Sequence, residues 1–142
     1  MSDDAARAVA ARLGDRAVLD APLGARTTYR VGGPAGVLFV AEDAGDLAAA
    51  AGAVAATGIE VAVVGRGSNL LVADTGFPGL VLILGEGLAG IDLSGRDGTV
   101  VAGGGADLPV LARRTAAAGW RGLEWAVGVP GCLLYTSDAA DE

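Results

Sequence analysis

Residues 61–71 read Val-Ala-Val-Val-Gly-Arg-Gly-Ser-Asn-Leu-Leu, and this stretch decides how the rest of the chain is interpreted. Its first four residues form a β-branched run that is typical of a buried strand. Two glycines follow, Gly65 and Gly67, which permit positive φ angles and allow the main chain to approach a ligand closely. The stretch therefore predicts a strand that opens into a tight loop and then enters a second apolar segment.

The side chains of this loop indicate what it could bind. Successive main-chain N–H groups in a glycine loop can form a concave site for an anion. Ser68 and Asn69 add side-chain donors, and Arg66 adds a fixed positive charge to an acidic protein. An ordinary tight turn, with Ser and Asn at turn positions, explains the same residues, so both interpretations stay open at this point.

The segments around the loop alternate between helical and strand patterns. Asp43 is a suitable N-cap for a helix that Gly58 would end. Helices are predicted at residues 3–13, 43–57 and 107–118, and strands at residues 37–40, 61–64, 70–72, 80–84, 91–93 and 99–102, with the last two joined as a hairpin. This order favours an α+β domain over a regular doubly wound sheet.

A second glycine motif, Gly85-Glu86-Gly87-Leu88-Ala89-Gly90, has the G-x-G-x-x-G spacing of dinucleotide sites. Such a site needs a helix directly after the loop, so that pyrophosphate meets the helix N-terminus. A strand and a turn are predicted there instead, so we interpret the motif as a coincidence in a glycine-rich chain. A third glycine run, residues 103–105, precedes Asp107, whose carboxylate would cap the following helix and repel phosphate.

Composition narrows the classes of function. A chain of 142 residues has room for one domain with a real core. Its net charge of −7 argues against nucleic acid as a partner, and no apolar run approaches the roughly 20 residues that span a membrane. The lack of histidine excludes a His base or His metal ligand, and the single Cys132 excludes an internal disulfide. Residues 1–20 lack the pattern of a secretory signal, so a cytoplasmic location is expected.

Another turn, Gly128-Val129-Pro130-Gly131, lies near the end of the chain. Proline fixes one φ angle there, while the flanking glycines permit unusual ones. Two tryptophans, Trp120 and Trp125, are more typical of core positions than of ligand stacking. Glu124 is more typical of a solvated carboxylate than of a general acid. By itself this region predicts a turn and no particular function.

Four segments, taken in order, resemble one family. They are Thr28-Tyr29-Arg30-Val31-Gly32-Gly33-Pro34, Val64-Gly65-Arg66-Gly67-Ser68-Asn69-Leu70-Leu71, Gly119-Trp120-Arg121-Gly122-Leu123-Glu124 and Gly128-Val129-Pro130-Gly131. Their order and spacing are similar to those of the MurB family of UDP-N-acetylenolpyruvoylglucosamine reductases, over roughly residues 19–131. The second segment and the last two are the specific ones.

This resemblance implies an incomplete FAD-binding domain of the vanillyl-alcohol oxidase/p-cresol methylhydroxylase type. It implies contacts with FAD from Gly65, Arg66, Gly67, Ser68, Asn69 and Leu70 and from Gly128, Val129, Pro130 and Gly131, with loop 65–69 at the pyrophosphate. The family reduces an enolpyruvyl ether on a UDP-sugar to UDP-N-acetylmuramate for peptidoglycan, and NADPH delivers the hydride to FAD. Its catalytic arginine, serine and glutamate lie further along, so no catalytic residue is assigned here.

The last residues differ in character from the rest. From Cys132 onward, residues 132–142 match the translation of a sequencing-library adapter, and we expect them to be a non-native tail. The predicted organisation is an N-terminal helical segment at residues 1–18, a partial FAD-binding domain at residues 19–131, and that tail. The polypeptide is expected to be inactive as it stands.

Two other hypotheses stay open beside this one. An FAD-dependent sugar or lactone oxidase would share loop 65–69 but pass electrons to oxygen. A non-catalytic nucleotide-binding module would bind its ligand without turnover.

Overall fold

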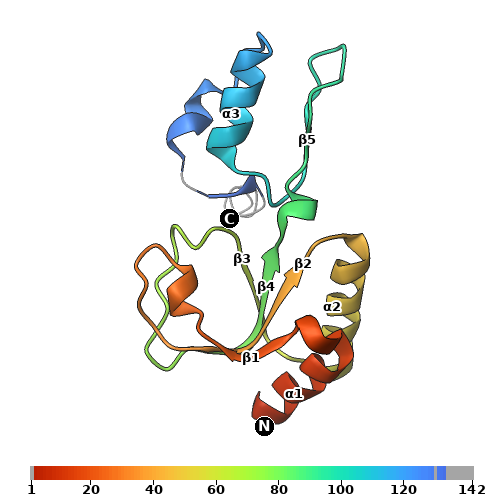
Figure 1. The fold of residues 1–142 in the computed structure, drawn as a ribbon, viewed down its shortest axis with the longest axis vertical. Coiled ribbons are helices and arrows are strands. Elements are labelled where there is room, and N and C mark those ends of the chain that lie inside the picture. Colours follow the sequence, from red (N-terminus) through yellow and green to blue (C-terminus); the bar gives the residue numbers. More distant parts are fainter. Residues whose placement is uncertain (1, 130, 134–142) are drawn as a thin grey trace.

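A computed structural model describes residues 2–129 and 131–133, which form two lobes (Figure 1). The sheet lobe, residues 2–85, contains a four-stranded sheet with helices on one side. The helical lobe, residues 86–129 and 131–133, stands beyond one end of that sheet. This mixture of strands and helices confirms the α+β class.

The sheet has the strand order β1-β2-β4-β3. Its members are β1 (Val18–Ala21), β2 (Ala35–Ala41), β4 (Phe77–Leu84) and β3 (Val61–Val64). Strand β1 is antiparallel to β2, whereas β4 runs parallel to both β2 and β3. The carboxyl ends of β2, β3 and β4 therefore share the edge that faces the helical lobe (Figure 1). Open α/β sheets bind ligands at such an edge, which directs attention to the loops that follow these strands.

Two helices, α1 (Ser2–Leu13) and α2 (Ala44–Thr57), cover one face of the sheet (Figure 1). The main core of the lobe lies between them and the sheet, and its buried members are Ala6, Val9, Val37, Phe39, Ala41, Ala50, Ala53, Ile59 and Leu80. Alanine dominates the helix side of this core, because small side chains let the helices lie close to the strands. The helix of the predicted 1–18 segment thus packs on the same core as the rest of the lobe, and the predicted domain boundaries stay a prediction.

The ends of α2 are formed as predicted. The Asp43 carboxylate accepts a hydrogen bond from the main-chain N–H of Asp46 at 2.9 Å, which caps the first turn. Gly58 ends the helix in the left-handed conformation, with φ of 65°. Both signals are local in the sequence, and both are confirmed.

Irregular chain covers the opposite face of the sheet. Its buried core consists of Ala21, Leu23, Ala35, Leu38, Val64, Val72 and Val81. The strand predicted at residues 70–72 is not formed there. Instead, Leu70 and Val72 pack their side chains onto this face of the sheet, so their apolar pattern reflects packing on the sheet and not pairing within it. The prediction of a strand at this place was wrong for that reason.

The helical lobe contains a short antiparallel pair, β5 (Ile91–Asp92) with β6 (Val101–Ala102), which confirms the predicted hairpin with shorter strands. Helix α3 (Leu108–Ala117) and a 3₁₀ turn at Glu124–Gly128 complete the lobe. Its small core is formed by Leu108, Leu111, Ala112 and Ala126. This core is separate from the two cores of the sheet lobe, although Leu88 of the helical lobe packs against the main one.

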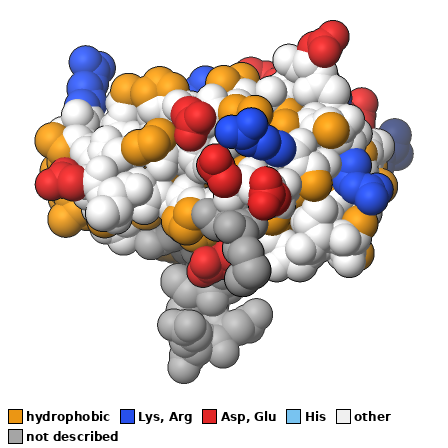
Figure 2. All heavy atoms as spheres, turned by 90° about the horizontal axis from the view of Figure 1, so that it is seen from below, with side chains coloured by type: hydrophobic (Ala, Val, Ile, Leu, Met, Phe, Trp, Pro, Cys, Tyr) orange, Lys and Arg blue, Asp and Glu red, His pale blue; other side chains and the backbone are white. Residues whose placement is uncertain are grey.

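The surface carries both signs of charge. Figure 2 shows acidic and basic side chains close to one another, among scattered hydrophobic ones, on the face seen from below. Within the described residues, no helix has the length and apolar character needed to cross a membrane.

Candidate functional site

A pocket of about 240 Å³ opens where β3 ends, at the carboxyl edge of the sheet. Leu23 and Phe77 line it from the sheet lobe, and Gly131 and Cys132 line it from the helical lobe. The loop after β3 supplies Gly65, Arg66, Gly67, Ser68, Asn69 and Leu70. All six residues predicted from this loop therefore line one cavity, and one member of the second predicted turn joins them.

The loop leaves hydrogen-bond donors available. Among the described residues, the main-chain N–H groups of positions 65–68 donate to no protein acceptor. The carbonyl of Gly67, in contrast, accepts a hydrogen bond from the main-chain N–H of Thr28 at 3.0 Å. The loop is thus held from its carbonyl side while four consecutive N–H groups remain for another acceptor. An anion-binding loop requires such unused donors.

Arg66 does not present a free charge to the pocket. Its Nε donates to Oδ1 of Asp107 at 2.7 Å, and its Nη2 donates to the other carboxylate oxygen of the same residue. This bidentate hydrogen bonding, followed by the charge of Asp107, raises the pKa of Arg66 above its ordinary value. The prediction of a fixed positive charge in the loop is therefore modified, because an acid 41 residues further along the chain neutralises it.

Asp107 occupies the N-cap position of α3, as predicted, but its side chain caps no N–H group of the helix. The carboxylate is hydrogen-bonded to Arg66 instead. The main chain around Asp107 also pairs with residues 131–133: the N–H of Leu108 donates to the Gly131 carbonyl at 3.3 Å, and the N–H of Leu133 donates to the Ala106 carbonyl at 2.9 Å. The start of α3 therefore joins loop 65–69 to residues 131–133.

The predicted turn at residues 128–131 lies only partly at the pocket. Gly131 lines the pocket, whereas Gly128 and Val129 do not. Val129 packs on the small core of the helical lobe, and its N–H donates to the carbonyl of Ala126 at 3.3 Å. Pro130 lies outside the described residues. A ligand seated in the pocket as it stands would therefore meet this turn first at Gly131.

The G-x-G-x-x-G motif at residues 85–90 is not a phosphate loop. A 3₁₀ turn at Glu86–Leu88 follows Gly85, and the short strand β5 comes next, so no α-helix begins there. The N–H of Gly87 donates to the Glu42 carboxylate at 2.9 Å. A protein carboxylate already occupies the position that an anion would take, which supports the interpretation of the motif as a coincidence.

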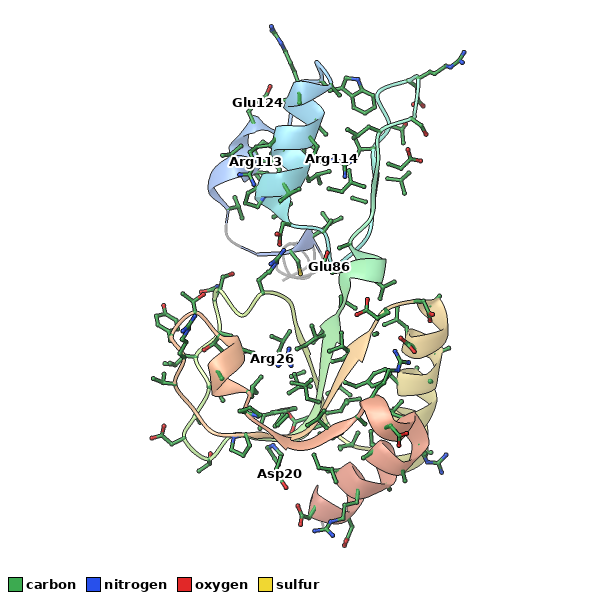
Figure 3. All side chains as sticks on the ribbon, in the orientation of Figure 1. Asp20, Arg26, Glu86, Arg113, Arg114 and Glu124 are labelled. Atoms are coloured by element: carbon green, nitrogen blue, oxygen red, sulfur yellow. The ribbon has the colours of Figure 1, made fainter. Side chains whose placement is uncertain are left out.

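Glu124 and Trp125 lie away from the pocket. Figure 3 shows Glu124 at the end of the helical lobe that is remote from the sheet. Its main-chain hydrogen bonds, including that from the N–H of Gly122 at 2.7 Å, lower the pKa of its carboxyl, which is opposite to the shift that a general acid needs. The Trp125 indole is 62% exposed and donates to the Gly122 carbonyl at 3.0 Å. The prediction of Trp125 as a core residue was therefore wrong.

The segment before β2 contributes residues that sequence reasoning did not connect with the site. Leu23 lines the pocket, and the main chain of residues 26–28 contacts Gly67. The Arg26 side chain, which is exposed, extends from the turn at Gly24–Arg26 toward the sheet (Figure 3). The motif at residues 28–34 was recognised only as part of a resemblance, because no local periodicity indicates which strand end it will contact. Among the described residues, no group of three or more His, Cys, Asp or Glu side chains could hold a metal ion.

Comparison with known proteins identifies the family of the chain. Residues 34–134 match the family model described as FAD binding domain. The match ends three residues beyond position 131, and the predicted boundary of the tail stays a prediction. Among curated proteins, the chain is 47% identical over 80% of its length to a UDP-N-acetylenolpyruvoylglucosamine reductase of Synechococcus sp. (strain CC9311), and 42% identical over 86% of its length to that of Rubrobacter xylanophilus.

A solved structure points the same way. The crystal structure of UDP-N-acetylenolpyruvylglucosamine reductase (MurB) from Thermus caldophilus matches 82% of the chain with a TM-score of 0.63 and 38% identity. The chain spans 36%, 40% and 38% of the length of these three relatives. The chain therefore belongs to the FAD binding domain family, and the relatives it resembles within that family are UDP-N-acetylenolpyruvoylglucosamine reductases.

Proposed function

We propose that this chain binds part of FAD in the pocket at the end of β3. Loop residues Gly65, Arg66, Gly67, Ser68, Asn69 and Leu70 would hold the diphosphate, and Gly128, Val129, Pro130 and Gly131 would lie toward the flavin. The observation that carries the proposal is the convergence of loop 65–70 and Gly131 on one cavity, with the N–H groups of positions 65–68 unused by described protein groups. Such donors suit a diphosphate, whose oxygens accept hydrogen bonds and carry negative charge.

The size of the pocket limits what this chain can hold. Pockets that enclose a whole small ligand usually measure about 300–1,000 Å³. The cavity here, at about 240 Å³, is smaller, so it suits one portion of a dinucleotide. Its apolar lining residues, such as Leu23, Val64 and Leu70, would exclude water from one side of that portion. We infer that the chain binds FAD weakly and that segments of a longer protein would complete the site.

We further propose that the longer protein reduces UDP-N-acetylenolpyruvoylglucosamine to UDP-N-acetylmuramate, with NADPH as hydride donor, for cytoplasmic peptidoglycan synthesis. The support is the similarity to reductases of that name. FAD supplies the hydride-transfer chemistry when bound. The residues of this chain bind and orient the cofactor, and none of those that the structure describes is placed to protonate a substrate. Glu124, whose carboxyl has a lowered pKa and lies far from the pocket, is not promoted to that role.

Titration of the 142-residue chain with FAD and with ADP tests the binding proposal. We expect saturable binding of both, measured by calorimetry and by flavin fluorescence. Ser68→Glu should abolish it, because a carboxylate in the loop repels the diphosphate. Ser94→Glu, which adds the same charge in the exposed hairpin turn, is the matched control and should bind as the wild type does. Equal loss in both variants, or none in either, would contradict the placement of the site.

Assays of turnover separate the proposed activity from the two alternatives. The 142-residue chain with FAD, NADPH and the enolpyruvyl substrate should form no UDP-N-acetylmuramate above background, because no described residue is placed to protonate the reduced substrate. Robust turnover would contradict this expectation. Hydrogen peroxide formed with a sugar substrate would favour an oxidase, and tight ADP binding without any binding of FAD would favour a nucleotide-binding module.

A further inference from the structure

Loop 65–69 contains a basic residue whose hydrogen-bonding capacity is already used. Arg66 and Asp107 meet through two hydrogen bonds, from Nε to Oδ1 at 2.7 Å and from Nη2 to Oδ2. The Arg66 side chain is 61% exposed, whereas that of Asp107 is 20% exposed. The arginine can therefore move into solvent or toward a ligand, while the aspartate is held in place at the start of α3.

Asp107 is held by its main chain. Its carbonyl accepts the N–H of Leu111 at 2.9 Å in the first turn of α3, and the residue forms an isolated antiparallel bridge with Cys132. Its carboxylate caps no N–H group of the helix, although the N-cap position would favour such a bond. The side chain instead holds the guanidinium of Arg66, which lines the pocket. The Asp107 side chain therefore contacts the candidate binding loop instead of capping α3.

This contact has an electrostatic consequence for anions. A diphosphate near the N–H groups of residues 65–68 would gain from a free guanidinium at Arg66, and it would be repelled by the carboxylate that now holds it. Ligand and carboxylate therefore compete for the same donors. The competition needs no movement of the backbone, because rotation of the exposed Arg66 side chain is sufficient.

We propose that Asp107 sets the affinity of the pocket for diphosphate ligands by competing with them for Arg66. The inference rests on the proposed function, since it assumes that loop 65–69 binds a diphosphate. Asp107 acts here as a positioning residue, because it works through the guanidinium and not through contact with the ligand. In a longer protein, any change at the start of α3 or at residues 131–133 that draws Asp107 away would tighten binding at the loop.

The test is a double-mutant cycle on the 142-residue chain, with ADP and inorganic pyrophosphate as probes and with calorimetry as the measurement. Asp107→Asn keeps the size of the side chain and the ability to cap the helix, and it should tighten binding about three- to tenfold. Arg66→Gln alone should weaken binding, because it removes the guanidinium for which the ligand competes and leaves the Asp107 carboxylate without that partner beside the pocket. In the double variant the gain from Asp107→Asn should be clearly smaller than in the wild-type background, because only repulsion by the carboxylate is then relieved.

Two controls make the cycle specific. Glu86 also raises the pKa of Arg66 by its charge, but no hydrogen bond joins the two among the described contacts. Glu86→Gln therefore removes an equal charge near the same arginine, and it should tighten binding clearly less than Asp107→Asn does. Asp107→Ser, another good N-cap, should reproduce Asp107→Asn, and thermal unfolding of each variant reports whether the fold is kept.

The outcomes separate the two proposals. A gain with Asp107→Asn that is equally large in the Arg66→Gln background would overturn the competition, because the effect would then be a general charge effect. Normal binding by the wild type without tighter binding by either Asp107 variant would overturn it as well. If neither the wild type nor any variant bound ADP, pyrophosphate or FAD, the proposed function itself would fail, and the inference would fail with it.

Discussion

Gly67 lies directly against the main chain of Arg26. A Cβ atom at position 67 would come within 2.4 Å of the Arg26 carbonyl oxygen, and the φ angle of Gly67 is 62°. The adjacent Thr28 N–H donates to the Gly67 carbonyl at 3.0 Å. The second glycine of the loop is therefore required by contacts within the protein. The conformation of the loop is set before any ligand binds, which reduces the entropy lost on binding.

We expect Gly67→Ala to lower the free energy of unfolding by at least about 2 kcal/mol. A left-handed φ costs a residue with a Cβ about 1–2 kcal/mol, and the contact with a main-chain oxygen adds to that. Urea unfolding, followed by circular dichroism, measures the change. A loss below about 0.5 kcal/mol would mean that the contact between positions 67 and 26 is not maintained in solution.

Gly52→Ala should have the opposite effect. Gly52 lies within α2, and a Cβ added there meets no atom within 4 Å. Alanine in a helix interior is favoured over glycine by about 0.5–1 kcal/mol, so the free energy of unfolding should rise by that amount. The same urea titration provides the measurement. Destabilisation would show that α2 is packed more tightly on its exposed side than the structure describes.

The loss of folding stability at low pH should depend on Asp46. Arg16 donates to its carboxylate at 2.9 Å through Nη1, and the Glu42 N–H donates to it at 2.8 Å. These hydrogen bonds, that of Arg16 first, lower the pKa of Asp46 to about 2. Because the folded pKa lies below the ordinary value of about 3.9, this contribution is complete above about pH 5 and is lost as the pH falls toward 2.

Asp46→Asn should therefore lower the urea midpoint at pH 6, and its difference from the wild type should shrink between about pH 5 and pH 2. Asp3→Asn is the matched control, because Asp3 forms an exposed pair with Arg7 one helical turn away. Exposed ion pairs contribute little to folding stability, so Asp3→Asn should leave the urea midpoint nearly unchanged at pH 6 and throughout the acid range. A constant difference for Asp46→Asn across this range would mean that the carboxylate does not titrate as described.

Glu42→Ala tests which glycine loop binds nucleotide. The substitution removes the acceptor of the Gly87 N–H and leaves the loop at residues 65–69 intact. We expect less than a twofold change in the affinity for FAD or ADP, because the G-x-G-x-x-G motif is a structural turn. If the motif at residues 85–90 bound phosphate, removal of the competing carboxylate would tighten binding markedly, and calorimetry would detect it.

Local structure followed from the sequence. The cap at Asp43, the stop at Gly58, the strand at residues 61–64 and the glycine loop after it were predicted and are present. Such features depend on residues within one or two turns of each other, so their causes lie in the same short window of sequence. The comparisons also confirm the family that the ordered motifs indicated.

Pairing across long distances did not follow from the sequence. Residues 70–72 have a strand-like pattern, yet they pack on the sheet because β4 takes the place beside β3. An apolar side chain is buried equally well in a segment that packs on a sheet and in a strand that belongs to the sheet. The spacing of apolar residues therefore cannot distinguish these two arrangements. The predicted turn at residues 128–131 likewise reaches the pocket only through Gly131 in the described chain.

The sequence by itself determined that a glycine loop would follow a buried strand and that the chain resembles a flavin-binding family. Only the tertiary structure decided the electrostatic character of that loop. The sequence of residues 65–69 alone predicts a free positive charge at Arg66. In the folded chain, Asp107 at the start of α3 forms an ion pair with Arg66. Charge in a folded protein depends on which groups meet, and groups far apart in the sequence meet only through packing.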